Sequence, residues 1–172
     1  MAWQDVKAGI GAILRIWLGF QWLMAGVGKV GNPVWTGDQA GAAVTGFLQG
    51  ALQKTGGPHP DVQWWYAWFV EHVALPNAKV FSYLVAYGEV LVGIGLILGA
   101  FTTAALLAGA LMNLNFLLAG AVSTNPIWLT VAVVLLFLGN SGRFGVDGLY
   151  RMYRDRRKPV PFIPDDRGRE VA

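Results

Sequence analysis

Four runs of apolar residues dominate the chain, and each has the length, or nearly the length, of a helix that crosses a lipid bilayer. They lie at residues 8–28, 80–100, 102–121 and 125–140. A transmembrane helix needs about 20 predominantly apolar residues. The fourth run is short, so we expect it to begin slightly earlier or to lie against a thinned edge of the bilayer. The pattern predicts an all-α membrane protein built as a bundle of four transmembrane helices.

Turn signals separate these runs. Asn125 followed by Pro126 predicts an N-cap and a proline at the first helical position, which marks the start of the fourth helix. The connection at residues 99–103 is short and uncharged. We therefore expect the second and third helices to form an antiparallel hairpin.

The long connection at residues 30–79 is expected to be partly helical. Residues 40–52 predict a short helix capped by Thr36 or Asp38. Residues 64–72 are dense in aromatic side chains, and Trp and Tyr gather at membrane–water interfaces. This aromatic run predicts a helix on or in the outer leaflet, whose rings either anchor the protein or line a ligand cavity.

The distribution of charge sets the expected orientation. Only 13% of the 172 residues are charged, against about 25% in a typical soluble domain. Eight of the 13 Lys and Arg residues follow Asn140, and such residues concentrate on the cytoplasmic side. We predict a multi-pass protein of the cell membrane with both termini in the cytoplasm and the long connection outside. Residues 1–150 would form the transmembrane domain and residues 151–172 a basic cytoplasmic tail, with no nucleic-acid partner.

The absence of cysteine excludes several kinds of chemistry. The chain has no Cys, so it has no disulfide, thiolate nucleophile, cysteine-ligated iron–sulfur cluster or c-type haem. His59 and His72 both lie outside the apolar runs. Paired histidine ligation of a haem inside the membrane is therefore not expected, and we predict no bound metal or haem.

Polar residues inside the apolar runs are the candidates for function. Glu89 lies near the middle of the second run, where an ionisable group costs on the order of 2.5–3.5 kcal/mol and by default indicates a functional site. At a rise of about 1.5 Å per residue, Gln21, Asn113 and Asn115 fall at a similar depth, with Arg15 within reach on the inner side. Two interpretations stay open. Arg15 and Glu89 form an ion pair that fixes helix register, or they line a polar cavity in which Glu89 accepts a proton and cations hold an anion.

The first helix is expected to present one cationic and aromatic face. Arg15, Trp22 and Lys29 repeat every seven residues. Lys29 and Lys79 flank the outer mouth of the bundle, where they either extend toward the headgroups or bind an anion. His72 is a candidate proton carrier because its charge changes near neutral pH.

Several segments resemble the DoxX/DoxD family of membrane proteins. Residues 14–29 are similar to the opening helix of that family. The other similar segments are the central block at 65–66, 76–77 and 87–93, the third helix and its turn at 112–126, and the closing segment at 140–149. Together they cover most of the chain.

The resemblance implies relation to the large subunit of thiosulfate:quinone oxidoreductase, which joins two thiosulfates into tetrathionate and passes their electrons to a membrane quinone. Glu89 and Arg15 then become the catalytic candidates. The candidates for binding thiosulfate or a similar small anion, and the quinone co-substrate, are Lys29, Lys79, His72, Trp22, Tyr87, Asn113 and Asn115.

Other activities fit the same resemblance. Family members also serve as membrane scaffolds for partner redox enzymes, so a non-catalytic scaffold or assembly subunit with a second redox subunit is the alternative to the enzyme. A small-molecule or lipid carrier is a third hypothesis. The enzyme is favoured, but fold membership alone does not decide the chemistry.

Overall fold

The computed structural model describes residues 3–139 and 141–157, and every regular element within them is helical. The elements in chain order are α1 (Trp3–Val30), α2 (Pro33–Thr36), α3 (Ala42–Leu52), α4 (Trp64–Phe69), the π-helical segment η1 (Val70–Ala74), α5 (Ala78–Leu98), α6 (Thr102–Leu118), α7 (Asn125–Leu138) and α8 (Val146–Arg156). The all-α expectation is confirmed for the described residues.

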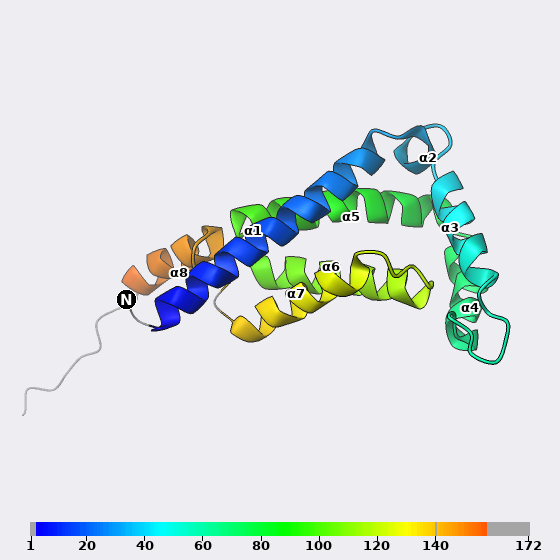
Figure 1. Ribbon diagram of the computed structural model, residues 1–172. Coiled ribbons are helices and arrows are strands. Elements are labelled where there is room, and N and C mark those ends of the chain that lie inside the picture. The colour runs from blue at the N-terminus through cyan, green and yellow to red at the C-terminus, as the bar shows by residue number, and fades with distance from the viewer. Residues whose placement is uncertain (1–2, 140, 158–172) are drawn as a thin grey trace, which may run out of the picture.

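The four longest apolar helices form a bundle (Figure 1). α1 packs most extensively on α5, α6 packs on α7, and the α5–α6 and α1–α7 contacts complete the arrangement. α1 and α5 have the length and composition of membrane-spanning helices. α6 and α7 are apolar but shorter, with 17 and 14 residues. Two helices therefore meet the expectation for a span by length and composition.

Glycine allows α1 and α5 to approach closely. A Cβ atom on Gly26 would lie 2.6 Å from the backbone nitrogen of Val90, and one on Gly93 would lie 2.5 Å from the nitrogen of Leu23. No larger residue fits at either position without moving a backbone. Small residues of this kind permit close helix packing inside membranes, and here they fix the register of α1 against α5.

A layer of leucines fills the half of the bundle nearer α8, which we call the inner half, and we call the opposite end of the bundle the outer end. Each of the four helices contributes one almost fully buried member to the same apolar cluster, and we call these residues the leucine layer: Leu18, Leu96, Leu106 and Leu135. Each of them is at most 2% exposed. This layer separates the inner end of the bundle from the cavity described below.

The long connection folds into a helical cap over the outer end of the bundle (Figure 1). The cap comprises α2, α3, α4 and η1, and its own apolar cluster includes Val44, Leu48 and Val70. The expected helix at residues 40–52 is confirmed as α3. The expected caps are wrong, because the N-cap position belongs to Gly41 in a left-handed conformation with φ 102°. Thr36 instead donates its hydroxyl to the Val30 carbonyl at 2.6 Å.

The start of α7 differs by one residue from the expected pattern. The helix begins at Asn125, as the Asn-Pro pair predicts, but the cap position belongs to Thr124. The Asn125 side-chain nitrogen donates backwards to the Ala121 carbonyl at 2.8 Å. Asn125 therefore closes the preceding turn and does not cap its own helix.

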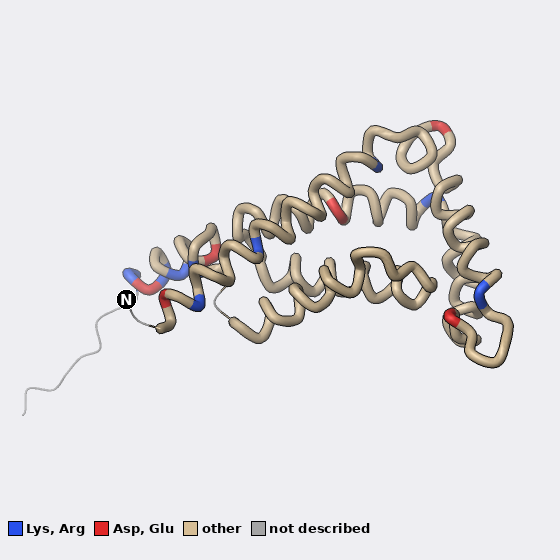
Figure 2. The backbone as a smooth tube through the Cα atoms, in the orientation of Figure 1, with Lys and Arg blue, Asp and Glu red and all other residues tan. Residues whose placement is uncertain are grey.

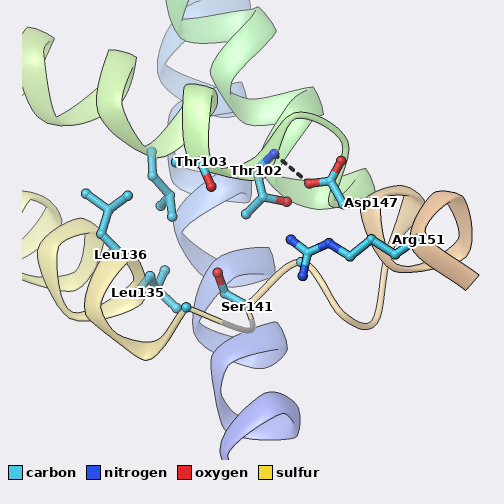
Figure 3. A pocket seen from close by; sticks show the side chains of 10 residues that line it. Thr102, Thr103, Leu135, Leu136, Ser141, Asp147 and Arg151 are labelled. Carbon is cyan, nitrogen blue, oxygen red and sulfur yellow. Dashed lines mark hydrogen bonds between the residues drawn. The ribbon is translucent and has the colours of Figure 1, made fainter. Parts of the chain in front are cut away.

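At the inner end, α5 and α6 form the expected antiparallel hairpin. The Asp147 carboxylate accepts hydrogen bonds from the backbone N–H groups of Phe101 and Thr102, at 2.9 and 2.8 Å, and so caps α6. Figure 3 shows the bond from Thr102. Arg143, four residues before Asp147, pairs with Asp5 at 2.9 Å.

Helix α8 runs through residue 150, the expected end of the transmembrane domain. The division into residues 1–150 and 151–172 therefore stays a prediction. Residues 158–172, which make up most of the expected basic tail, lie outside the described residues.

Candidate functional site

A large cavity lies between the bundle and its helical cap. Its volume is about 840 Å³, and we call it the outer cavity. Much of its wall is aromatic: Trp35, Phe47, Tyr66, Phe69, Phe81, Phe116 and Trp128. The wall is otherwise largely aliphatic, with Lys29, Glu89 and Asn115 among its few polar side chains.

The cavity exists because α5 and α6 separate toward their outer ends (Figure 1). Near the inner end they touch, since a Cβ on Gly95 would lie 3.3 Å from the Cβ of Ala105. Farther out, the Ser82 hydroxyl of α5 donates to the Trp35 carbonyl of the cap at 2.6 Å. The Tyr66 hydroxyl of the cap donates to the Asn115 carbonyl of α6 at 3.0 Å. The cap thus holds both helices apart and bridges the space between them.

An ion pair is embedded in the cavity wall. Lys29 Nζ of α1 lies 2.6 Å from Glu89 Oε2 of α5. The Glu89 side chain is 2% exposed and that of Lys29 is 22% exposed. Lys29 also donates to the Ala25 carbonyl at 3.3 Å and lies 5.2 Å from the centre of the Trp35 ring. Charged residues are sparse along the bundle helices (Figure 2), which makes this buried pair the main polar feature of the site.

Arg15 does not belong to this site, so the expected Arg15–Glu89 contact is wrong. Arg15 is 1% exposed, and its Nη2 donates to the Phe144 carbonyl at 2.9 Å. A Cβ on Gly99 would overlap its guanidinium group. Arg15 precedes Lys29 by about four helical turns, or about 21 Å along α1. Arg15 therefore joins the middle of α1 and the inner end of α5 to the segment before α8.

The physical reason for this error is the position of α1 along the bundle. The expected helix began at residue 8, but α1 begins at Trp3 and extends beyond the inner ends of its neighbours. Gly26 packs against the backbone of Glu89 and Val90. Gln21 was expected at the depth of Glu89. It precedes Gly26 by five residues and therefore lies about 8 Å nearer the inner end than Glu89 does.

A second, much smaller cavity lies at the inner end (Figure 3). Its volume is about 50 Å³, and Thr102, Ser141, Asp147 and Arg151 are among its lining residues. Burial alone would raise the pKa of Asp147, but hydrogen bonds from Thr102 and Phe101 and the positive charge of Arg151 bring it below its usual value. This space suits one or two water molecules, and none of the predicted site residues lines it.

The two candidate asparagines of α6 have different surroundings. Asn115 lines the outer cavity. Its Nδ2 donates to the Leu111 carbonyl at 2.8 Å, and its Oδ1 accepts from Tyr66 at 3.4 Å. Asn113 is fully buried, and neither atom of its amide has a hydrogen-bond partner. Because Met112 faces Gly88, Asn113 lies at the level of Glu89, as its depth in the sequence predicts.

The aromatic candidates Trp22 and Tyr87 lie outside the cavity wall. Trp22 is 1% exposed and meets Trp128 edge to face, with ring centres 5.1 Å apart. Trp22 therefore packs against Trp128, which lines the cavity, without lining the cavity itself. Tyr87 is half-exposed and stacks on Tyr83, on the side of α5 away from the cavity.

Lys79 and His72 are also remote from the cavity wall. Lys79 is exposed, and its backbone packs against Gly41. His72 is exposed and stacks on Trp68 with ring centres 4.9 Å apart, while its Nδ1 lies 2.9 Å from the Trp68 carbonyl. The structure therefore brings together Lys29, Glu89 and Asn115, with Asn113 at the same level.

The aromatic run at 64–72 divides between the cavity wall and the protein surface, so the cavity-lining alternative is supported and the anchor stays a prediction. Tyr66 and Phe69 line the cavity, whereas Trp64 and Trp68 are 80% and 58% exposed. Burial raises the pKa of Tyr66 to about 12, so its hydroxyl remains a hydrogen-bond donor at neutral pH. Because residues three or four apart share one face of a helix, the spacing of Tyr66 and Phe69 could have indicated this division.

Trp35, Phe47 and Trp128 are wall residues that sequence reasoning missed. They come from three different helices, and only the packing of the cap on the bundle brings them together. No local spacing in the sequence indicates that they share a wall. Among residues 3–139 and 141–157, no three His, Asp or Glu side chains lie close enough together to hold a metal ion.

The DoxX family model matches residues 47–121 of the chain. The matched segment runs from α3 through α6 and contains Glu89, Asn115 and most of the aromatic wall. The match supports the DoxX family and a membrane protein of the DoxX type. No curated protein and no solved structure matches the chain.

Proposed function

We propose, from the DoxX match and the geometry of the outer cavity, that this chain is a quinone-linked oxidoreductase subunit of the cell membrane. In this proposal the outer cavity binds a membrane quinone, and thiosulfate supplies the electrons. The observation that carries it is the Lys29–Glu89 pair, at 2.6 Å, in the wall of a largely apolar cavity of about 840 Å³.

The proposed topology has four crossings, with both termini in the cytoplasm and the cap outside. α6 and α7 would be about 26 and 21 Å long, against a hydrocarbon core of about 30 Å. They lie alongside α1 and α5 in the bundle (Figure 1). A short helix is accommodated by local thinning of the bilayer, and packing against two longer helices supports the crossing of the two shorter ones.

The outer cavity has the properties that a quinone site requires. Small-molecule sites usually measure about 300–1,000 Å³ and combine apolar walls with a few polar groups. Aromatic rings such as Trp128 and Phe116 offer flat apolar surfaces for a quinone ring. Lys29 and the Asn115 amide are the donors available to its carbonyl oxygens.

The reaction balances with the groups present. Two thiosulfate dianions each give one electron and become joined by a new S–S bond in tetrathionate. The quinone takes up both electrons together with two protons. Glu89 can hold and deliver one proton at a time, and Lys29, which is partly exposed, connects it to water. Glu89 is thus the proposed proton carrier, and it is reprotonated twice in each turnover.

The proposed anion site depends on the protonation of Glu89. While Glu89 is ionised, it neutralises Lys29, and the pair attracts a dianion weakly. When Glu89 carries a proton, the Lys29 charge becomes available to thiosulfate. Ser123 and Thr124 form an exposed polar edge of the same cavity, which provides access for a water-soluble anion. Arg15 and Lys79 take no part in this proposal.

The test is thiosulfate-dependent reduction of decylubiquinone by the purified protein in lipid nanodiscs. Turnover should fall about a hundredfold in Glu89→Gln, the scale expected on loss of a general acid or base. Lys29→Met should lose comparable activity. Tyr87→Phe is the matched control, because this residue lies on the same helix but outside the cavity, and it should retain wild-type turnover.

Two results would contradict the proposal. A wild-type protein that binds quinone but gives no thiosulfate-dependent turnover would exclude thiosulfate as the donor. Co-purification of a soluble redox enzyme, together with no turnover by the isolated chain, would instead favour the scaffold function.

A further inference from the structure

The outer cavity opens sideways between α5 and α6. Leu84 and Leu111 both line it, yet they are 60% and 61% exposed on the surface of the molecule. Ala108 likewise lines the cavity and is exposed. Residues that face a cavity and the exterior at once mark its rim, so the three residues define an opening between these two helices.

The surface around this rim is apolar. Leu91 of α5 and Leu107 of α6 lie nearby on the same helices and are 68% and 55% exposed. α6 carries no charged residue. A ligand that arrives here from water would meet only hydrocarbon side chains, whereas one that arrives from the bilayer would keep the same kind of surroundings.

The polar end of the cavity lies close to this opening. Gly88 lines the cavity directly beside Glu89. A Cβ on Gly88 would lie 3.5 Å from the sulfur of Met112 on α6, so a glycine and a flexible thioether border the passage between the helices. Met side chains adapt readily to the shape of a neighbour. A head group at the Lys29–Glu89 pair can therefore continue as a chain past Gly88 to the exterior.

We infer that the outer cavity takes its quinone sideways from the bilayer, and that the quinone's long apolar tail leaves the protein between α5 and α6. This inference rests on the proposed quinone site and names the class of quinone that fills it. The head group occupies the cavity beside Glu89, the tail crosses the rim at Leu84, Ala108 and Leu111, and its remainder lies in the lipid.

The test compares two probes, decylubiquinone and the same benzoquinone head group without a tail. Binding is measured in lipid nanodiscs by quenching of tryptophan fluorescence, since Trp35 and Trp128 line the cavity. Ala108→Trp places an indole in the rim. It should weaken binding of decylubiquinone about tenfold, because steric exclusion discriminates between ligands that otherwise bind alike. Binding of the tailless head group should change by less than about twofold.

Leu107→Trp is the matched control, since it places the same side chain one residue away on the exposed face of α6, outside the cavity. It should bind both probes as the wild type does. Leu84→Trp blocks the rim from α5 and provides a second variant if Ala108→Trp does not fold. Size-exclusion profiles and thermal melts establish folding for each protein.

The outcomes separate this inference from the function on which it rests. If the rim variants bind decylubiquinone as well as the control does, the sideways passage is wrong while the quinone site stands. If neither probe binds the wild-type protein, the quinone site is wrong and the passage fails with it.

Discussion

Lys29 and Glu89 neutralise each other's charge in a cavity wall that is otherwise nearly free of ionisable groups. Removing one partner of such a pair leaves the other buried and unpaired, at a cost of about 3–5 kcal/mol in typical proteins. Replacing both residues with uncharged ones leaves no buried charge without a partner. The stability of the pair is therefore a property of two residues and not of either one alone.

We predict that Lys29→Met lowers the free energy of unfolding by about 3 kcal/mol. The double variant Lys29→Met/Glu89→Gln should recover most of this loss. Unfolding of detergent-solubilised protein, followed by far-UV circular dichroism, measures both quantities. Equal destabilisation by the single and the double variant would show that the two charges do not interact energetically.

Sequence reasoning found both members of this pair but joined Glu89 to the wrong cation. Glu89 stands out because a carboxylate in an apolar run has few alternatives to a functional or paired role. Its partner depends on how far α1 is shifted along α5, which the close contacts at Gly26 and Gly93 determine. The sequence of one helix does not indicate that shift. Counting depth from the expected helix ends therefore placed Arg15 too close to Glu89.

At the scale of the element, glycine positions on α1 should differ sharply in their tolerance of a methyl group. A Cβ on Gly26 meets the backbone of α5, whereas one on Gly28 meets nothing within 4 Å. We predict that Gly26→Ala lowers the free energy of unfolding by about 2 kcal/mol, as overpacking of a tight interface does. Gly28→Ala should be neutral or stabilise by up to about 1 kcal/mol through helix propensity.

Thermal melts of the two alanine variants, prepared and measured side by side, check this contrast. Equal tolerance of alanine at the two positions would mean that α1 and α5 do not meet at Gly26.

The cap on α6 predicts a pH dependence at the inner end of the bundle. Hydrogen bonds from Thr102 and Phe101 hold the pKa of Asp147 below its usual 3.8. A carboxylate with a lowered pKa contributes stability above its usual value, and this contribution is lost as the pH falls from about 4 through the lowered pKa. Asp147→Asn should cost about 1 kcal/mol at pH 7, because an amide offers one oxygen where the carboxylate offers two, so that one of the two hydrogen bonds is lost.

Melting temperatures of the wild type and Asp147→Asn between pH 3 and pH 7 test this prediction. The difference between the two proteins should shrink below about pH 4. A difference that stays constant with pH would mean that the carboxylate charge does not contribute to the cap.

For the whole molecule, the proposed topology predicts which residues face each side of the membrane. The chain has no natural cysteine, so single cysteines can be introduced without background labelling. In intact cells, a membrane-impermeant maleimide should label Thr55→Cys in the cap and Thr124→Cys before α7. Arg154→Cys on α8 should react only after the membrane is permeabilised. A Thr124→Cys protein that is protected in intact cells would argue against the two crossings by α6 and α7.

The global arrangement was easier to predict than the site. Long apolar runs indicated the bundle helices, and turn signals placed most of their ends within a few residues. The cavity wall was only partly predictable, because Trp35 and Phe47 reach it through the docking of the cap. The lengths of α6 and α7 also differ from the expected runs, since residues 119–121 end the third run in a turn and not in helix.

The leucine layer has a consequence for how the molecule behaves as an electrical barrier. The side chains of Leu18, Leu96, Leu106 and Leu135 carry no polar atom, so this layer should interrupt a file of water between the inner end and the outer cavity. Protons that Glu89 takes up for the proposed quinone reduction would then come from the outer face of the membrane. Vesicles that contain the protein should consequently hold an imposed pH gradient as long as empty vesicles do.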